Sequence, residues 1–459
     1  MPLQTRHTDH DHALKFKMKP IQAGLMGTGT VGSGTFNVLQ RNQAEIQRRA
    51  GRAIAITMVA DLDTARATNL VGDAARVVSD ARAIIANPDI DIVIELIGGY
   101  GIAKSLVMEA IAAGKHVVTA NKALLAVHGT EIFAAAREKG VVVAFEAAVA
   151  GGIPIIKALR EGLTANRIEW IAGIVNGTTN FILSEMRDKG LDFDAALSQA
   201  QALGYAETDP TFDIEGTDAA HKTTLMSAIA FGIPVQFEHA HIEGISHLQA
   251  ADITYAEQLG YRIKLLGITK RRFGDEGAVI GIELRVHPTL IPMKRLIANV
   301  EGAMNAVMVH GDAVGTTLYY GKGAGSEPTA SAVIADLVDI TRLQTALPNQ
   351  RVPHLAFQPD ELAATPIMAI EQVVSSYYLR LQVADQTGVL ARITAILAGF
   401  DISIDAMLQR ESAEGESQTD VIILTHDTVE GKMNQAIAQM QALPTVLAPI
   451  VRLRKEELS

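Results

Sequence analysis

Short apolar runs alternate with Ala-rich stretches of helical periodicity through the first third of the chain. From Ile21 a short apolar strand is followed by a glycine-rich turn and by a helix expected over 31–49. Further elements follow in the same alternation, with strands expected over 53–60, 91–96, 116–119 and 141–145 and helices over 103–113 and 130–139. Apolar strands separated by helices are typical of a parallel sheet covered on both faces. The pattern predicts a doubly wound α/β domain over 19–149.

The rest of the chain changes character after Gly152. Helices are expected over 181–186, 194–203 and 218–231, and strands over 278–287 and 306–310. We expect an α+β substrate-binding catalytic domain over 150–330, then a returning helix and a Pro- and Ala-bearing linker over 331–372. The order strand, turn, helix, strand, strand, helix predicts a separate small α+β module over 373–455. Residues 1–18 are expected to form a flexible tail.

The composition narrows the classes of partner. The 459 residues are 48% hydrophobic and 20% charged, which is enough apolar material for about two or three domains with their own cores. A formal net charge of −11 disfavours nucleic acid and anionic lipid surfaces, and no apolar run is long enough to span a bilayer. The N-terminus lacks the apolar core of a signal peptide, so we expect a cytoplasmic protein that binds small molecules and other protein chains. His7, His10 and His12 could bind a metal, but a frayed tail explains them better.

The glycine-rich turn reads Gly27-Thr-Gly29-Thr-Val-Gly32 and lies between the first strand and the first helix. In this position, Gly27 permits the tight turn, Gly29 lets the backbone approach a pyrophosphate, and Gly32 lets helix and strand pack closely. The helix N-terminus offers unpaired N–H groups to the anion. The motif predicts a dinucleotide site in a Rossmann-type domain, made by Gly27, Thr28, Gly29, Thr30, Val31 and Gly32; the alternative is a purely structural turn.

The second strand ends at Asp61. A carboxylate there usually accepts hydrogen bonds from the ribose hydroxyls of adenosine and favours NAD. Arg66 lies a short turn away and could instead pair with a 2′-phosphate, which favours NADP. These two residues leave the choice between NAD and NADP open. Later strands end at Glu95-Leu-Ile-Gly98-Gly99 and at Thr119-Ala-Asn-Lys122, where open α/β sheets bind ligands.

Residues 204–222 pack five carboxylates ahead of a single lysine, Lys222. Asp218 and Lys222 are four apart at the start of a predicted helix and so share one face. A substrate ammonium group could lie between them and the acidic loop, while the lysine acts as general acid to a carbonyl oxygen that receives hydride. The alternative is a surface ion pair worth about 0.3–0.5 kcal/mol, and the local pattern alone slightly favours it.

A second polar turn carries Asn176-Gly-Thr-Thr-Asn180 at the start of another helix. Its amide and hydroxyl groups could bind a substrate carboxylate. Helix N-capping explains the same residues equally well, so this turn alone decides nothing.

Taken together and in order, these motifs and Glu146-Ala-Ala-Val-Ala-Gly-Gly-Ile-Pro154 closely resemble bacterial homoserine dehydrogenase over about residues 19–455. The resemblance implies the reversible NAD(P)H-dependent reduction of L-aspartate 4-semialdehyde to L-homoserine, and it reverses the local preference for a surface ion pair at Lys222. It implies that Lys222 donates the proton to the aldehyde oxygen and that Lys122 lies near the nicotinamide. It also implies a substrate site made by Glu207, Asp213, Asp218, Asn176, Gly177 and Thr178.

The same resemblance implies further ligand sites. A monovalent cation, sodium or potassium, is expected at Glu146, Val149, Gly151 and Ile153. The cofactor is expected to contact Gly98, Lys122 and Gly325, the last in a returning loop Gly321-Lys-Gly-Ala-Gly-Ser. Family members that prefer NADP often carry a basic residue where this chain has Ala60, so the cofactor preference stays open.

The C-terminal module resembles an ACT domain, with a loop Asp385-Gln-Thr-Gly388 before its first helix. The resemblance implies effector binding at Asp385 and Gly388, with threonine as the expected effector, and a homodimer or homotetramer. The alternative is an ACT module used only for dimerisation.

Two other functions fit the sequence less well than the dehydrogenase. Aspartate-semialdehyde dehydrogenase handles the same metabolite through a cysteine thioester, and this chain has no cysteine. A non-catalytic sensor of dinucleotide and amino acid would be expected to have a broken acid and lysine constellation, and Glu207, Asp218 and Lys222 are all present.

Overall fold

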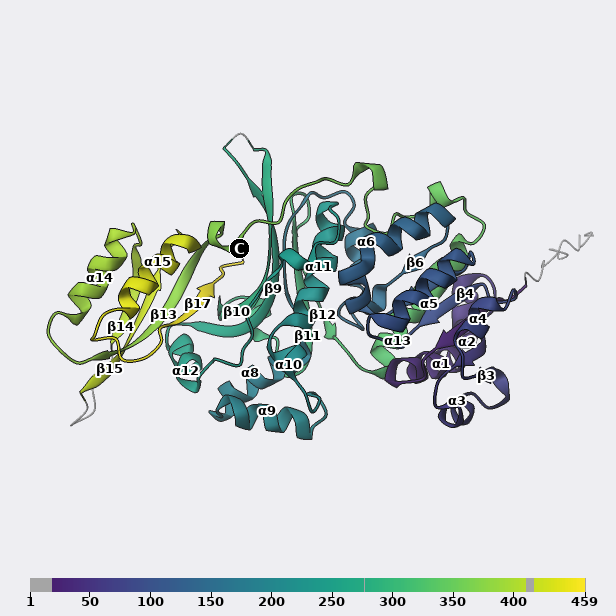
Figure 1. Ribbon diagram of the computed structural model, residues 1–459, viewed down its shortest axis with the longest axis horizontal. Helices are drawn as coiled ribbons and strands as arrows, with labels where there is room; N and C mark the ends of the chain where they lie inside the picture. The colour runs from purple at the N-terminus through teal and green to yellow at the C-terminus, as the bar shows by residue number, and fades with distance from the viewer. Residues whose placement is uncertain (1–18, 276, 410–416, 459) are drawn as a thin grey trace, which may run out of the picture.

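The computed structural model describes residues 19–275, 277–409 and 417–458, which form three parts in a row along the long axis (Figure 1). The dinucleotide-type domain lies at one end, the C-terminal module at the other, and a large sheet with its helices between them. The expected tail over 1–18, with its three histidines, lies outside the described residues. Within the described ranges, no helix is long and apolar enough to cross a membrane.

The first sheet has six parallel strands in the order β3-β2-β1-β4-β5-β6. Their bounds are Ile21–Met26 (β1), Ile54–Ala60 (β2), Arg76–Val78 (β3), Ile92–Glu95 (β4), His116–Thr119 (β5) and Val143–Ala144 (β6). The order reverses between β1 and β4, and open parallel sheets bind ligands at that crevice. The predicted doubly wound fold is confirmed.

Helices cover both faces of this sheet. They are Thr30–Arg41 (α1), Gln43–Ala50 (α2), Thr64–Val71 (α3), Arg82–Ala86 (α4), Gly101–Ala112 (α5) and Lys122–Lys139 (α6). The single helix expected over 31–49 is wrong, because Asn42 leaves the helical conformation with φ −105° and ψ 15° and separates α1 from α2. Late in the chain, Ser326–Leu343 (α13) returns to pack against α1.

The second sheet has eleven strands in the order β12-β11-β7-β9-β10-β17-β13-β15-β14, with β8 beside β10 and β16 beside β13. Strand bounds are Ile168–Ile174 (β7), His241–Ile242 (β8), Tyr261–Phe273 (β9), Val279–Pro292 (β10), Met304–Gly311 (β11), Gly315–Lys322 (β12), Val374–Ala384 (β13), Ile404–Gln409 (β14), Gln418–Thr425 (β15), Thr428–Val429 (β16) and Val451–Lys455 (β17). The sequence pattern did not predict β7, β9 or β12.

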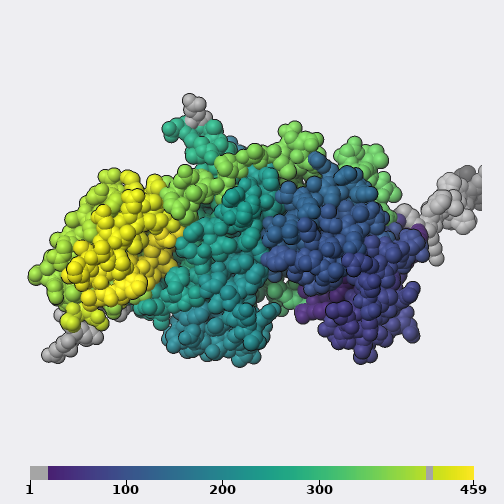
Figure 2. All heavy atoms as spheres, in the orientation of Figure 1, coloured from purple at the N-terminus to yellow at the C-terminus, as the bar shows by residue number. Residues whose placement is uncertain are grey.

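The remaining helices pack on this sheet. They are Ile155–Lys157 (α7), Gly177–Lys189 (α8), Phe193–Ala202 (α9), Thr211–Ile214 (α10), Thr217–Phe231 (α11), Ala250–Gln258 (α12), Val389–Gly399 (α14) and Glu430–Gln441 (α15). Helix α11 is buried along almost its whole length and lies against α6 of the first domain (Figure 1). Figure 2 shows a hollow between the central part and the dinucleotide-type domain, beneath this contact.

The C-terminal module shares its sheet with the central part. Strand β17 pairs in parallel with β10, with Thr289 opposite Arg454, and antiparallel with β13 on its other side. The backbone hydrogen bonds therefore continue from the central part into the small α+β module.

Candidate active site

The glycine-rich turn lies at the crevice between β1 and β4. Gly27 has a φ of 94°, and a Cβ there would lie 2.7 Å from the carbonyl oxygen of Leu96. A Cβ at Gly32 would lie 2.0 Å from the carbonyl oxygen of Gly27, whereas Gly29 faces open space. No side chain caps α1, which begins at Thr30, so its first N–H groups are available to an anion.

A cavity of about 410 Å³ opens beside this turn. Its lining includes Gly27, Gly29, Asp61 and Arg66, together with the segment 79–82. A cavity of this size falls in the range of small-molecule and cofactor sites, roughly 300–1,000 Å³. The turn, the free helix end and the cavity together fit the pyrophosphate and adenosine portions of a dinucleotide.

Asp61 is already bonded within the protein. Its Oδ2 accepts from the backbone N–H and the hydroxyl of Thr28, at 2.7 and 2.5 Å, and from Arg66 at 3.0 Å. Its Oδ1 accepts from the backbone of Asp63 at 2.9 Å. Burial alone would raise the pKa of Asp61, but these hydrogen bonds lower it to about 2. The carboxylate therefore holds the glycine turn and Arg66 in place.

The loops after β4 and β5 are tied to one another. The Glu95 carboxylate accepts from the backbone of Ile97 and Gly98, at 2.9 and 3.0 Å, and from the Thr119 hydroxyl at 2.7 Å. Asn121 caps α6 and donates to the carbonyl of Gly99 at 2.8 Å. Helix α6, which begins at Lys122, is therefore placed rigidly at the crevice.

Two lysines from different domains share the carboxylate of Asp218. Lys222 Nζ lies 2.7 Å from Oδ2 within α11, and Lys122 Nζ lies 3.1 Å from Oδ1 across the contact with α6. Lys222 Nζ also donates to the carbonyl of Val175 at 2.7 Å. Asp218 is 3% exposed and Lys222 9%, so the alternative of a surface ion pair is wrong.

The charges of this cluster shift one another's pKa. Burial opposes the charged form of Asp218, but Lys222 and Lys122 outweigh it and hold its pKa well below the ordinary value. Burial alone would lower the pKa of Lys122, but the charge and hydrogen bond of Asp218 raise it above its ordinary value. For Asp213, burial and the like charge of Asp218 raise the pKa. At neutral pH the core of the site is therefore an ionised Asp218 carboxylate that lies between two lysines.

The polar turn at the start of α8 completes the cluster. Asn176 caps α8 through Oδ1, which accepts from Thr179 N at 2.8 Å, while its Nδ2 donates to Asp213 at 2.8 Å and to Asp218 at 2.9 Å. The Thr178 hydroxyl bonds to Asp213 at 3.1 Å. The N-capping explanation of this turn is confirmed, while the amide and hydroxyl donors expected to bind a substrate carboxylate bond to Asp213 and Asp218 instead.

Two further residues of the expected substrate site lie around this cluster. Glu207 is exposed, and its negative charge contributes to the raised pKa of Lys122. Within the described residues, its side chain has no hydrogen bond or ion pair. Gly177 lies against Ala303, where a Cβ would come within 2.8 Å of the carbonyl oxygen. Glu207 is therefore the carboxylate most available to a substrate at the mouth of the site.

The other expected sites are built from other segments of the chain. Gly325 precedes α13, and the neighbouring Ser326 hydroxyl donates to the carbonyl of Thr30 at 2.8 Å, which brings the returning loop to the glycine turn. The Glu146 carboxylate accepts from the N–H groups of residues 156 and 157, at 2.9 and 2.8 Å. Asp385 and Gly388 precede α14, a helix that lies in the part of the molecule farthest from the dinucleotide-type domain (Figure 1).

Sequence reasoning missed an aromatic cluster beside the lysines. His221, on α11, is fully buried among three rings, with centroid distances of 4.3 Å to Phe237, 5.4 Å to Phe212 and 6.5 Å to Tyr100. Tyr100 belongs to the first domain, so the cluster crosses the domain contact. Burial lowers the pKa of His221 to about 4, so the ring is neutral at pH 7. Only the position of His221 beside Lys222 could have signalled it.

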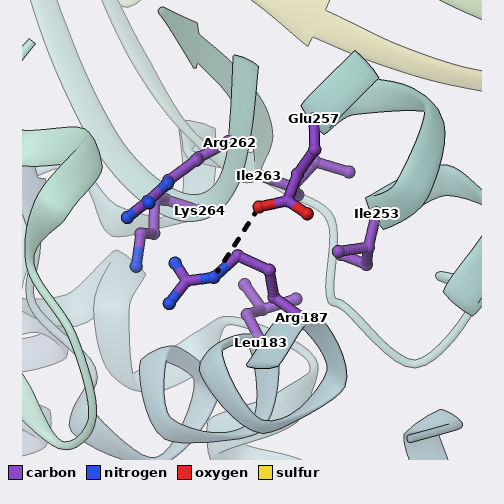
Figure 3. A pocket seen from close by; sticks show the side chains of 7 residues that line it. All are labelled: Leu183, Arg187, Ile253, Glu257, Arg262, Ile263 and Lys264. Atoms are coloured by element: carbon purple, nitrogen blue, oxygen red, sulfur yellow. Dashed lines mark ion pairs between the residues drawn. The ribbon is translucent and has the colours of Figure 1, made fainter. Parts of the chain in front are cut away.

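A second cavity, between α8, α12 and β9, lies outside the site (Figure 3). At about 10 Å³ it holds at most one water, since a water needs roughly 10–15 Å³. It is lined by Leu183, Arg187, Ile253, Glu257, Arg262, Ile263 and Lys264. The buried Lys264 donates to Asn180 at 2.9 Å and so supports α8 from behind, a role that the sequence did not reveal.

Comparison with known proteins agrees with this geometry. The family model "Homoserine dehydrogenase, NAD binding domain" matches residues 27–146, "Homoserine dehydrogenase" matches 154–338, and "ACT domain" matches 377–444. Homoserine dehydrogenase of Pseudomonas aeruginosa is 60% identical over 96% of this chain and 100% of its own length, and that of Neisseria gonorrhoeae is 56% identical over the same shares.

Solved structures give the same result. The crystal structure of a homoserine dehydrogenase from Thiobacillus denitrificans is 64% identical and has a TM-score of 0.91, covering 96% of this chain and 99% of that one. The S. aureus homoserine dehydrogenase at pH 7.5 is 31% identical with a TM-score of 0.72, over 96% and 99% of the two chains.

The fold and the site define a nicotinamide-dependent oxidoreductase, because a dinucleotide crevice meets a buried cluster of lysines and carboxylates. The chain belongs to the homoserine dehydrogenase family. It carries out the NAD(P)-dependent interconversion of L-aspartate 4-semialdehyde and L-homoserine, and its C-terminal module is an ACT domain.

Proposed function

We propose that Lys222 is the proton donor in the reduction of the aldehyde and that Lys122 is the second catalytic lysine. The observation that carries this is the Asp218 carboxylate shared by the two ammonium groups at the domain contact. An ammonium group has three N–H donors, and Asp218 and Val175 take two of those of Lys222. The third is left for the aldehyde oxygen.

The substrate ammonium group is bound by the carboxylates of Glu207 and Asp213, with Asp218 behind them. Asn176 and Thr178 hold Asp213 and Asp218 in position through the turn at α8. A nicotinamide cofactor held at the glycine-rich turn would supply the hydride for the carbonyl carbon. As the carbonyl oxygen gains negative charge, Lys222 Nζ transfers a proton to it, and the product is the alcohol. In the reverse direction neutral Lys222 removes the hydroxyl proton.

The preferred cofactor is NADP. Both oxygens of Asp61 already accept hydrogen bonds from the protein, which leaves little capacity for ribose hydroxyls. The guanidinium of Arg66 is half-exposed at the cavity and can turn from Asp61 to a 2′-phosphate. The balance between the two cofactors is tested by the ratio of their kcat/KM values.

A monovalent cation, sodium or potassium, is held mainly by backbone carbonyls in the turn 146–153. Ala150 and Gly151 both have positive φ, 53° and 43°, and in the described residues no backbone N–H donates to the carbonyls of Val149 or Gly151. The Glu146 carboxylate instead accepts hydrogen bonds from two backbone N–H groups of α7. The cation would supply a fixed charge that holds this turn against the returning loop. Replacing sodium and potassium by tetramethylammonium is expected to slow the reaction.

The ACT domain gives the enzyme feedback by threonine, bound near Asp385 and Gly388, and the active species is a homodimer or homotetramer. Gly388 is the N-cap of α14 with a φ of 84°, and no side chain caps this helix start, which suits it to bind the carboxylate of an amino acid. Millimolar threonine should lower the rate; an unchanged rate would leave the module a role in assembly only. Light scattering gives the oligomeric state.

The decisive test of the catalytic assignment is Lys222→Ala. We expect kcat to fall by about 10²–10⁴-fold, the usual contribution of a positioned general acid. The affinity for the dinucleotide, measured by fluorescence titration, should stay unchanged because the cofactor cavity lies in the other domain. A variant with near-normal kcat would remove Lys222 from the mechanism.

A further inference from the structure

The seam between the central part and the ACT domain, where β17 pairs with β10, contains a partly buried ionic cluster centred on Glu243. Arg454, on β17, is fully buried, and its two terminal nitrogens donate to the two oxygens of Glu243 at 2.8 and 2.9 Å. Arg452, on the same strand, donates to Glu243 at 3.0 Å. One carboxylate of the central part therefore holds two arginines of the C-terminal strand.

The same arginines are tied to the interior of the ACT domain. Arg454 Nε donates to Glu430, in the first turn of α15, at 2.8 Å, and Arg452 lies 3.2 Å from the same carboxylate. The hydroxyl of Tyr377, on β13, also bonds to Glu430, at 3.3 Å. A shift of α15 or β13 would therefore move the arginines that hold Glu243.

On its other side, Glu243 is joined to the substrate carboxylates by a tight backbone contact. Its N–H donates to the carbonyl of Val286 at 2.8 Å, which fixes the segment on β10. Two residues later, the N–H of Ile245 donates to the carbonyl of Ile214 at 2.8 Å. Between them, a Cβ at Gly244 would lie 2.5 Å from that same carbonyl oxygen, so the segment 243–245 presses directly on α10.

Helix α10 carries Asp213 and leads into α11. Asp213 immediately precedes Ile214, and Gly216 is the N-cap of α11, whose first turn holds Asp218. A Cβ at Gly216 would lie 3.4 Å from the carbonyl oxygen of Glu243. The segment 243–245 therefore contacts the chain on both sides of the turn that sets the spacing of Asp213 and Asp218.

We propose that Glu243 is a positioning residue for the substrate carboxylates, and that through Arg452 and Arg454 it couples the ACT domain to them. This role rests on the substrate site proposed above for Asp213 and Asp218. Glu243 touches no substrate, and its effect passes through the segment 243–245 to α10. The side chain of Glu243 is held by the arginines of β17, and its backbone N–H is held by β10. The position of Glu243 therefore depends on the position of the ACT domain.

Glu243 suits this role because its charge is firmly held. Burial would raise its pKa, but hydrogen bonds from His241 and Arg454 keep the pKa far below the ordinary value. Glu243→Gln keeps the volume and removes one negative charge that Arg452 and Arg454 share. The chain offers a control in Glu456→Gln, because Glu456 lies at the same seam, is buried, and like Glu243 binds two cationic side chains, Lys270 and Arg285.

The experiment measures KM for L-homoserine, KM for the dinucleotide and kcat in full-length wild type, Glu243→Gln, Glu456→Gln and Asp213→Asn. Glu243→Gln is expected to raise KM for L-homoserine by about 2- to 30-fold, the range for residues along a coupling network, with an unchanged KM for the dinucleotide. Glu456→Gln should leave both constants unchanged, although its unfolding temperature falls as much as that of Glu243→Gln. Gly244→Ala places a methyl group against α10 without changing a charge, and it should also raise KM for L-homoserine. If Glu243→Gln does not fold, this variant tests the contact between the segment 243–245 and α10.

Two results would overturn the role of Glu243. In the first, Glu243→Gln keeps the wild-type KM for L-homoserine while Asp213→Asn raises it, which leaves the substrate site intact and removes only the coupling. In the second, Glu456→Gln raises KM as much as Glu243→Gln, which makes the effect one of general seam stability. An unchanged KM in Asp213→Asn would instead refute the substrate site, and with it the coupling.

Discussion

Replacing Asp218 by asparagine removes the one carboxylate that two lysines share. Asp218 accepts from Lys222 at 2.7 Å, from Asn176 at 2.9 Å and from Lys122 at 3.1 Å, and it is 3% exposed. Removing one partner of a buried ion pair costs about 3–5 kcal/mol, because the other charge stays buried without its counterion. Asp213 offsets part of this loss, because its like-charged neighbour disappears. We therefore expect the free energy of unfolding to fall by about 3 kcal/mol, at the lower end of that range.

The single tryptophan provides the assay. Trp170 lies on β7 in the central sheet, so its fluorescence follows unfolding of the part that carries α11, whatever the other domains do. Urea unfolding at pH 7 would compare wild type, Asp218→Asn, Lys122→Met and the double variant. The double variant should lose less than the sum of the single losses, by about 0.5–3 kcal/mol, because Lys122 is no longer left unpaired.

The pH dependence checks the electrostatic cause. The pKa of Asp218 is lower in the folded state than in the unfolded chain, so its stabilisation is present above the ordinary value of about 3.9 and is lost as the pH falls through the folded pKa. The difference in the free energy of unfolding between wild type and Asp218→Asn should therefore become smaller under strongly acidic conditions. Coincident unfolding curves at pH 7, or losses that simply add in the double variant, would refute the shared ion pair.

Two further predictions follow from other parts of the structure. Arg66→Ala should lower kcat/KM for NADP⁺ by about tenfold or more, the value of a charge-assisted hydrogen bond, and leave NAD⁺ unaffected; equal losses with both cofactors would exclude contact with the 2′-phosphate. His116 and His354 accept N–H groups of residues 142 and 143, at 2.9 and 3.1 Å, and burial lowers the pKa of both to about 4. Since the unfolded chain binds these protons more readily, stability is lost as the pH falls from about 6.5 to about 4. The double variant His116→Asn with His354→Gln keeps an acceptor at both positions but cannot be protonated. Its unfolding temperature should therefore fall less between pH 7 and 5 than that of wild type. An equal fall would show that these two histidines do not cause the loss of stability.

Features that depend on local chain geometry could be predicted from the sequence. The glycine turn needs only a strand, three glycines and a helix start, and Gly27 indeed has the positive φ that this turn requires. The contact between Asp218 and Lys222 follows from the rise of a helix, in which residues four apart share a face. The break of the first helix at Asn42 was missed because helical periodicity continues on both sides of it.

Features that depend on the packing of distant segments could not be predicted in this way. Lys122 meets Asp218 only because α6 and α11 pack across a domain contact, and nothing near either residue in the sequence indicates that pairing. The family resemblance named both lysines but gave no geometry. The cluster around Glu243 was missed for the same reason, since its arginines come from the last strand of the chain.

The most direct test of the central claim is the initial rate of NADP⁺ and NAD⁺ reduction with L-homoserine, each beside a reaction without L-homoserine. The structure predicts reduction that depends on L-homoserine, with a higher kcat/KM for NADP⁺. A folded protein that binds the dinucleotide but reduces neither cofactor would contradict the assigned reaction and favour a sensor that only binds its ligands.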